Sequence, residues 1–324
     1  MALRIEDYAL IGDCETAALV GRDGSIDWLC LPRFDSDSCF AALLGEPQNG
    51  RWMIAPREAA EVTRRYQENT LILETTFKTA EGTVLLIDFM PPKDKASGVM
   101  RIVVGIKGSV KMRSELVIRF DYGLTVPWVT RLDDGSLCAV AGPQMLLMKT
   151  PVAVRGEDMK TIGEFTIEPG ERLPFVLAHM PSHLPLPELP DPFTALDETE
   201  RFWREWSVTC KQAGRWSEAV LRSLITLKAL TFAPTGGIVA APTTSLPEKI
   251  GGHRNWDYRF CWVRDATLTL LALMGAGYFQ EARAWRDWLL RAVAGSPAQL
   301  QIMYGVGGER RLWEWEVPWL AGYE

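Results

Sequence analysis

The sequence predicts an antiparallel β-sandwich followed by a helical half, and three observations indicate this division. Up to residue 180, short apolar runs separated by turn residues recur at intervals of about a dozen residues, as in antiparallel sandwiches. Five prolines then lie within residues 181–192. Beyond them the spacing of apolar residues changes from two towards 3.6, which is the period of an α-helix.

The first half contains hairpin and strand signals in sequence order. An Asp-Gly pair at residues 23–24 separates two apolar runs between residues 17 and 31, which indicates a β-hairpin. Residues 34–45 favour one short capped helix, because a polar Asp-Ser lead precedes Leu-Leu and a glycine. No βαβ alternation is visible. Further strands are predicted at residues 52–55, 71–77, 83–89, 101–106, 115–120, 128–132, 137–141, 145–148, 164–167 and 174–178.

The prolines divide the chain into two predicted domains. Proline fixes φ and lacks an N–H group, so a cluster of prolines disfavours both helices and central strands. We therefore predict a sandwich domain at residues 1–180, a linker at 181–196 and a helical domain at 197–324. Glycines and apolar spacing mark the helix limits. Helices are expected at residues 197–212, 217–231 (with Ser217 as its cap), 265–274 and 279–294.

The composition excludes several classes of partner. A chain of 324 residues is longer than one hydrophobic core usually serves. Its net charge of -6 gives no electrostatic reason to bind nucleic acid or an anionic membrane, so a neutral ligand fits best. The six cysteines form no C-x-x-C pair and have no nearby histidine. We therefore expect reduced, mostly buried thiols and neither a metal site nor a cofactor.

The N-terminal residues and the apolar runs of the chain indicate neither a signal peptide nor a membrane span. Residues 1–7 lack the apolar region of a signal peptide. A run of about 18 apolar residues, which a membrane-spanning helix requires, is found nowhere in the chain. We therefore expect a cytoplasmic protein.

One stretch, residues 251–267, combines aromatic and charged side chains between a Gly-Gly pair and an apolar run. Aromatic rings offer flat apolar faces to the C–H faces of a sugar, and carboxylates and guanidinium groups bind its hydroxyls. Ten of the 13 tryptophans lie after residue 200. The candidate sugar-binding residues are Trp256, Asp257, Tyr258, Trp262, Arg264 and Asp265.

Neighbouring features allow structural interpretations. The loop at residues 234–249 is long and rich in small residues, and such loops are usually functional or packed against a site. Asp265 could instead be the N-cap of the following helix, with Arg264 as its ion-pair partner. His253 has no second ligand at metal spacing and is expected to make a loop hydrogen bond. Trp285 and Trp288 are expected to pack within a helix.

Four stretches resemble the bacterial and archaeal branch of glycoside hydrolase family 15, which includes glucoamylases, glucodextranases and acid trehalases. They are residues 7–13 (DYALIGD), 23–36 (DGSIDWLCLPRFDS), 233–248 (APTGGIVAAPTTSLPE) and 255–265 (NWDYRFCWVRD). Their length, order and distribution make the resemblance specific. One departure is Cys14, which stands where the family pattern would have a glycine.

The resemblance implies an N-terminal β-sandwich followed by an (α/α)6 barrel, of which this chain would contain the start. It implies inverting, exo-acting hydrolysis of terminal α-glucosides, such as maltooligosaccharides, starch-type glucans or trehalose. Arg264 and Asp265 would bind hydroxyls of the terminal glucose, and Tyr258 and Trp262 would line the same subsite. The acid and base would be glutamates in later segments that these 324 residues do not match. We therefore assign no catalytic residue and expect a truncated chain that is nearly inactive alone.

Two other readings stay open at this point. The chain could be a non-catalytic carbohydrate-binding or scaffold protein that uses a face of the sandwich. Alternatively, the missing helices could come from another polypeptide or another copy of the chain. Exposed apolar surface on four helices would then favour a homo-oligomer.

Overall fold

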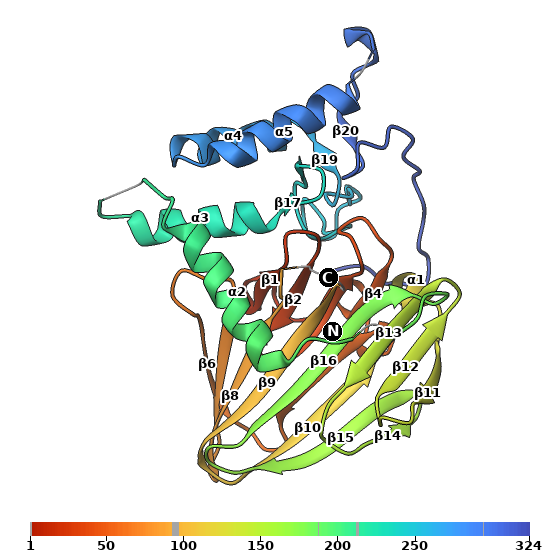
Figure 1. Ribbon diagram of the computed structural model, residues 1–324. Helices are drawn as coiled ribbons and strands as arrows, with labels where there is room; N and C mark the ends of the chain where they lie inside the picture. Colours follow the sequence, from red (N-terminus) through yellow and green to blue (C-terminus); the bar gives the residue numbers. More distant parts are fainter. Residues whose placement is uncertain (1, 93–96, 187, 212–213, 294) are drawn as a thin grey trace.

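The computed structural model describes residues 2–92, 97–186, 188–211, 214–293 and 295–324. Two eight-stranded antiparallel sheets form the lower part of the molecule in Figure 1. One helix crosses the outside of a sheet, and the other long helices lie above one end of the sandwich (Figure 1). The predicted order of a sandwich followed by helices is therefore confirmed.

The first sheet has the strand order β1-β2-β3-β5-β10-β15-β14, with β4 paired to β3. Its strands are β1 (Tyr8–Gly12), β2 (Ala17–Gly21), β3 (Ser25–Cys30), β4 (Ser38–Phe40), β5 (Arg51–Pro56), β10 (Val110–Val117), β14 (Val154–Glu157) and β15 (Lys160–Ile167). The second sheet has the order β11-β12-β13-β16-β9-β8-β7-β6. Its strands are β6 (Glu61–Tyr66), β7 (Leu73–Lys78), β8 (Gly82–Phe89), β9 (Ser97–Gly108), β11 (Trp128–Arg131), β12 (Leu137–Ala141), β13 (Gln144–Lys149) and β16 (Arg172–Pro181).

The helical part carries two small ladders besides its helices. Its helices are α2 (Pro192–Ser207), α3 (Ser217–Ala229), α4 (Val263–Gly275) and α5 (Phe279–Ala292), whereas the single turn α1 (Phe120–Gly123) belongs to the sandwich. Short 3-10 helices are η1 (Ile5–Asp7), η2 (Ala42–Leu44), η3 (Pro47–Asn49) and η4 (Pro297–Gln299). The ladders pair β17 (Thr231–Phe232) with β18 (Gly237–Ile238), and β19 (Cys261–Trp262) with β20 (Met303–Tyr304). Among the described residues, no helix is both long and apolar enough to span a membrane.

The main core lies between the two sheets. On β7, for example, Leu73, Thr75 and Phe77 are buried and alternate with more exposed residues, because successive strand residues face opposite sides of a sheet. Trp52 from the first sheet meets Phe175 from the second edge to face, with ring centroids 6.5 Å apart. The alternating pattern therefore identifies the inward face of β7.

Helix α2 covers the outer face of the second sheet. Its Ala195 and Leu196 pack with Phe89 and Ile102 from that sheet. The helix begins earlier than predicted, because Pro192 occupies its first position, where no N–H is needed. The Asp191 side chain accepts hydrogen bonds from the N–H groups of the next turn and acts as the N-cap. Residues 192–196, which we assigned to the linker, are therefore helical; the domain limits themselves stay a prediction.

Most of the predicted strands and helices are present, with shifted ends. The Asp23-Gly24 hairpin is confirmed as β2 and β3. The helix predicted at residues 34–45 is wrong, because Ser38 and Phe40 extend the first sheet beside β3. In the sandwich, β1, β4, β6 and β14 were missed, and so were the short strands β17 to β20 beyond it. The cap of α3 is Trp216 and not Ser217, without a side-chain bond. Three predicted positions, Pro187, Gln212 and Ala294, lie outside the described residues.

The cysteines match the expectation of reduced, mostly buried thiols. All six are free, and only Cys210 is not fully buried. Cys14 adopts a left-handed conformation with φ of 65°, which explains why the family pattern has a glycine at this turn. Its side chain packs with Trp203 and Ile225, so the sandwich meets α2 and α3 at this thiol.

We predict that Cys14→Gly is more stable than Cys14→Ala. Both variants lose the packed sulfur, but only alanine keeps the left-handed strain, which costs roughly 1 kcal/mol. Urea unfolding of the two purified variants measures the difference. A free energy of unfolding that is equal in the two, or higher for alanine, would contradict the strain argument.

The buried Arg101 is paired with Asp88 within the second sheet and also bonds to the first sheet. The Nε of Arg101 lies 2.7 Å from Oδ1 of Asp88, and both side chains are fully buried. The same guanidinium donates to the carbonyl oxygens of Trp52 at 2.8 Å and Gly24 at 2.7 Å, which belong to the first sheet and its hairpin.

We predict that Arg101→Met lowers the free energy of unfolding by about 3–5 kcal/mol, because it leaves the Asp88 carboxylate buried without a partner. The double variant Arg101→Met, Asp88→Leu should recover part of that loss, since it removes the stranded charge. Denaturant titration of the three proteins checks both statements. A double variant no more stable than the single one would contradict them.

Candidate functional site

Residues 255–262, here called the aromatic loop, lie against the long loop at 234–249. Thr244 and Asp257 form an isolated antiparallel bridge. On either side, the amide of Ser245 donates to the Trp256 carbonyl at 3.1 Å, and that of Ala241 donates to the Tyr258 carbonyl at 2.9 Å. The loop at 234–249 therefore packs against the aromatic loop. The aromatic loop pairs with it at Asp257 and bends at Arg259 and Phe260.

The side chains of the aromatic loop alternate between two sides. Arg259 and Cys261 are buried, at 3% and 0% exposure, whereas Trp256 is 48% exposed. Tyr258 and Trp262 are partly exposed. Arg259 and Cys261 therefore face the interior of the protein, whereas Trp256, Tyr258 and Trp262 reach the surface.

Two outward rings form the apolar part of the candidate site. Tyr258 and Trp262 lie with ring centroids 5.5 Å apart and planes inclined by 35°. The Nε1 of Trp262 donates to the Asp257 carbonyl at 3.0 Å, which fixes the orientation of the indole. Burial and the nearby Glu248 carboxylate raise the pKa of Tyr258, so its hydroxyl stays protonated. The pair is a surface on which the C–H face of a sugar could stack.

Arg264 and Asp265 follow directly, in the first turn of α4. Nη2 of Arg264 lies 3.1 Å from Oδ2 of Asp265, and the side chains are 73% and 32% exposed. The N-cap of the helix is Trp262, without a side-chain cap bond, so the interpretation of Asp265 as the N-cap is wrong. An ion pair this exposed adds little stability. Its free donors and acceptors remain available to solvent or to a ligand.

Asp257 differs from the other candidates, because its carboxylate is already engaged inside the loop. Its two oxygens accept from Nε and Nη2 of Arg259 at 2.7–3.2 Å. The amide of Arg259 also donates to Oδ1 at 2.9 Å. These contacts favour a structural role for Asp257. Its assignment as a sugar-binding residue stays a prediction that the geometry does not favour.

Sequence reasoning missed the residues that fix the loop. The Nη2 of Arg259 donates to the hydroxyl of Tyr122 in the sandwich at 2.7 Å. The sequence did contain a signal for Arg259. Aromatic residues occupy every second position of residues 255–262, which leaves Arg259 and Cys261 together on the other set of positions. The partner, Tyr122, gave no sequence signal, because it lies 137 residues away.

The last residues of the chain pack on the same tyrosine. The Nε1 of Trp319 donates to the Tyr122 carbonyl at 2.9 Å, and the Trp315 ring lies edge-on to the Tyr122 ring at 5.7 Å. Figure 1 shows this segment in blue, descending from the upper helices to the sandwich near α1. Trp313 and Trp315 remain 75% and 57% exposed, so further aromatic surface is available in this segment.

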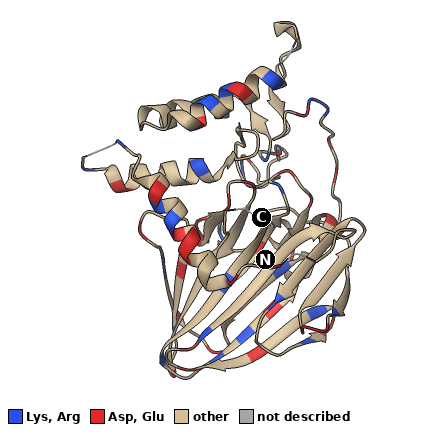
Figure 2. Ribbon diagram, in the orientation of Figure 1, with Lys and Arg blue, Asp and Glu red and all other residues tan. Residues whose placement is uncertain are grey.

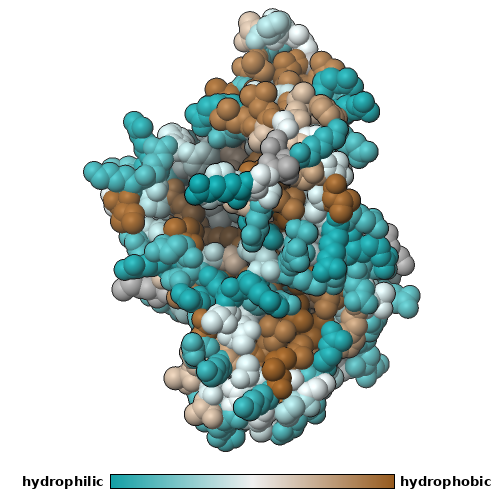
Figure 3. Space-filling model, turned by 90° about the vertical axis from the view of Figure 1, so that its left-hand side faces the viewer, coloured by the Kyte–Doolittle hydropathy of each residue, from teal (hydrophilic) through white to brown (hydrophobic). Residues whose placement is uncertain are grey.

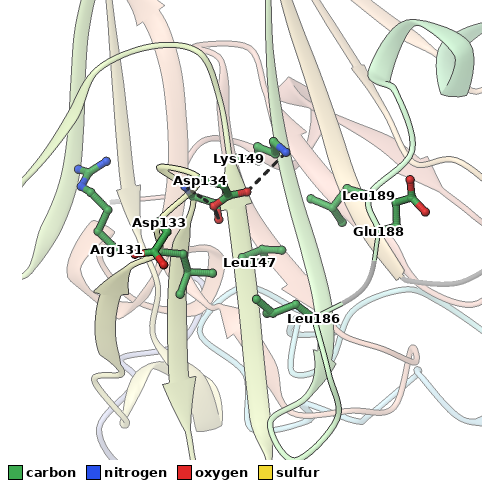
Figure 4. Close-up of a pocket in the computed structure, with 10 residues that line it drawn as sticks. Arg131, Asp133, Asp134, Leu147, Lys149, Leu186, Glu188 and Leu189 are labelled. Atoms are coloured by element: carbon green, nitrogen blue, oxygen red, sulfur yellow. Dashed lines mark hydrogen bonds and ion pairs between the residues drawn. The ribbon is translucent and has the colours of Figure 1, made fainter.

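Another concave region lies on the sandwich, where the 182–191 segment meets β11 and β13. Its volume is about 630 Å³ (Figure 4). Leucines form much of it, and Asp134 at its rim is paired with Lys149 at 3.6 Å. None of its described lining residues is aromatic. This depression is therefore less suited to stacking a sugar than the aromatic loop.

The charge distribution gives no single binding face for an ionic partner. Figure 2 shows acidic and basic residues interspersed over the strands and helices. Within the described part of the chain, no three His, Cys, Asp or Glu side chains gather as metal ligands. The candidate site therefore consists of aromatic rings and one exposed ion pair.

Comparison with known proteins gives two family matches, one in each half of the chain. Residues 1–179 match the family model described as trehalase-like, N-terminal, and residues 214–324 match glycosyl hydrolases family 15. The trehalase of Mycolicibacterium smegmatis is 33% identical over 99% of this chain and 52% of its own length. Trehalase 1 of Sulfolobus acidocaldarius is 33% identical over 99% of this chain and 55% of its own length. The chain thus spans about half the length of the curated relatives it matches.

A solved structure shows the same fold. The crystal structure of a bacterial glucoamylase complexed with acarbose superposes with a TM-score of 0.67 and 12% sequence identity. The match covers 95% of this chain and 53% of the other. The order of sandwich and helices is therefore shared with that enzyme.

Proposed function

The chain belongs to glycosyl hydrolase family 15 and carries a trehalase-like N-terminal domain, and we propose that it binds the terminal glucose of an α-glucoside. One observation carries this proposal. The outward rings of Tyr258 and Trp262 lie next in sequence to the exposed ion pair of Arg264 and Asp265. Apolar faces beside charged hydrogen-bonding groups are what a pyranose requires.

The proposed arrangement binds one glucose at its free end. The rings of Tyr258 and Trp262 contact the C–H face of the sugar, and Arg264 and Asp265 bind neighbouring hydroxyls. Because charged groups bound to these hydroxyls leave no room for a further sugar, the arrangement selects chain ends and gives exo cleavage.

The names of the relatives support trehalose as the first class of substrate. The curated relatives that cover 99% of this chain are named trehalases. Trehalose consists of two glucose units joined through their anomeric carbons, so each end presents a terminal glucose to this site. Maltooligosaccharides and starch-type glucans present the same terminal unit and form the second class of substrate.

Hydrolysis itself needs two further groups. Inversion requires a carboxylic acid at the leaving oxygen and a carboxylate that activates water, about 6.5–9.5 Å apart. We assign neither role to a residue of these 324. The family resemblance gives both to glutamates in segments that this sequence does not match.

A second candidate function is non-catalytic carbohydrate binding on the sandwich. The observation that favours it is the depression between β11, β13 and the 182–191 segment. Arg131 and Glu188 at its rim could bind hydroxyls. Its floor of leucines makes it the weaker of the two sites.

We predict that Arg264→Ala weakens binding of trehalose and glucose at least tenfold, because a charged hydrogen bond is worth about 1.5–3 kcal/mol. Isothermal titration calorimetry measures the affinity. The matched control is Arg286→Ala, since Arg286 is also an exposed helical arginine paired with the next aspartate, at 2.7 Å. If Arg264→Ala still binds sugar with unchanged affinity, the proposal is contradicted and the sandwich becomes the better candidate for the binding site.

We also predict that the 324-residue chain alone does not hydrolyse trehalose, maltose or maltooligosaccharides at a measurable rate. A coupled glucose assay on the purified chain tests this. Robust release of glucose would mean that an acid and a base lie among these residues after all.

A further inference from the structure

The side chain of Arg259 is fully satisfied at a buried position. A guanidinium has five N–H donors. Those of Nε and Nη2 bond Asp257 and the Tyr122 hydroxyl, the latter at 2.7 Å. Those of Nη1 bond the Ser36 carbonyl at 2.7 Å and the Cys30 sulfur at 3.4 Å. Removing any partner would leave a buried donor without an acceptor, which is costly.

These partners come from both parts of the molecule. Asp257 belongs to the aromatic loop itself, whereas Cys30, Ser36 and Tyr122 belong to the sandwich. The guanidinium also lies 5.4 Å from the centre of the Tyr122 ring and 5.9 Å from that of Trp28. A second tie runs beside it, where Nε1 of Trp28 donates to the Pro242 carbonyl at 2.8 Å. The sandwich therefore holds the aromatic loop from beneath.

The turn that presents Tyr122 is strained. Asp121, Tyr122 and Gly123 have φ of 53°, 56° and 88°, so three successive residues are left-handed. For the two residues with a side chain, this costs roughly 1–2 kcal/mol each. Such strain persists only where neighbouring contacts enforce it, and it is often found at functional sites. Here Phe120 and Thr125 exchange two backbone hydrogen bonds across the turn, at 2.9 and 3.0 Å.

The hydrogen bonds of Arg259 also influence the outward ring of Trp262. Arg259 binds the Asp257 carboxylate, and the Asp257 carbonyl accepts from the indole of Trp262 at 3.0 Å. Asp257 thus bonds Arg259 through its carboxylate and Trp262 through its carbonyl oxygen. The position of Arg259 is therefore linked to the orientation of the Trp262 indole.

We propose that Tyr122 and Arg259 are positioning residues, through which the sandwich sets the geometry of the sugar-binding rings of the aromatic loop. This rests on the proposed function of those rings. Neither residue contacts the sugar; they act through Asp257 on Trp262. The β-sandwich then supports the binding site by holding the aromatic loop in place, although it does not contact the sugar.

The test compares Tyr122→Phe with a matched control, Tyr66→Phe. Phenylalanine keeps the Tyr122 ring against Trp315 and removes only the hydroxyl. Tyr66 also uses a half-buried hydroxyl, which donates to the Leu10 carbonyl at 2.8 Å, outside the aromatic loop. Trehalose affinity by calorimetry should fall roughly three- to tenfold in Tyr122→Phe and stay unchanged in Tyr66→Phe.

A second readout follows the ring directly. The chain is labelled with 5-fluorotryptophan, and the Trp262 resonance is assigned from Trp262→Phe. That ¹⁹F resonance should move or broaden in Tyr122→Phe and not in Tyr66→Phe. Should Tyr122→Phe fail to fold, Arg259→Lys takes its place, because a lysine keeps the charge but cannot supply five donors.

Weaker binding together with a moved Trp262 resonance supports the proposal. An affinity loss without movement of Trp262, or movement without an affinity loss, overturns it, as does no change in either. If the unmutated chain binds no sugar, the proposed function fails; a moved resonance then still supports mechanical positioning of the loop, and an unmoved one overturns that too.

Discussion

The buried guanidinium of Arg259 is the interaction on which the relation between the two parts depends. A buried charge is stable only when its hydrogen bonds are made. Its partners come from the aromatic loop and from the sandwich, up to 229 residues away in sequence. The loop therefore adopts its conformation only when the sandwich is folded beneath it.

Other contacts add to the same attachment. Helix α2 lies on the outer face of the second sheet, and Cys14 at the β1–β2 turn packs with α2 and α3. In the helical part, Glu281 of α5 accepts from Trp206 of α2 and Lys228 of α3. Figure 3 shows hydrophobic surface on the upper helices, where α4 exposes Leu268 and Leu271. The sandwich and the helices form one packed body, with apolar helix surface left open on the side away from the sandwich.

The candidate site follows from this arrangement. The strained turn at Tyr122 and the loop at 234–249 both bond to the aromatic loop. What remains outside are two rings and the ion pair of Arg264 and Asp265. Rigid support beneath a small set of exposed groups suits recognition of one sugar unit, because little conformational entropy is lost on binding.

The sequence by itself determined most strands of the sandwich, the helices α3 to α5 and the aromatic composition of the site, since turn residues and apolar periods act over a few neighbours. It misplaced the helix at 34–45, where pairing of Ser38 and Phe40 with β3 outweighs local propensity. Only the tertiary structure decided that the Asp257 carboxylate and the Tyr122 hydroxyl both accept hydrogen bonds from Arg259. Such contacts join residues far apart in the chain, and their energy depends on burial, which no local pattern records.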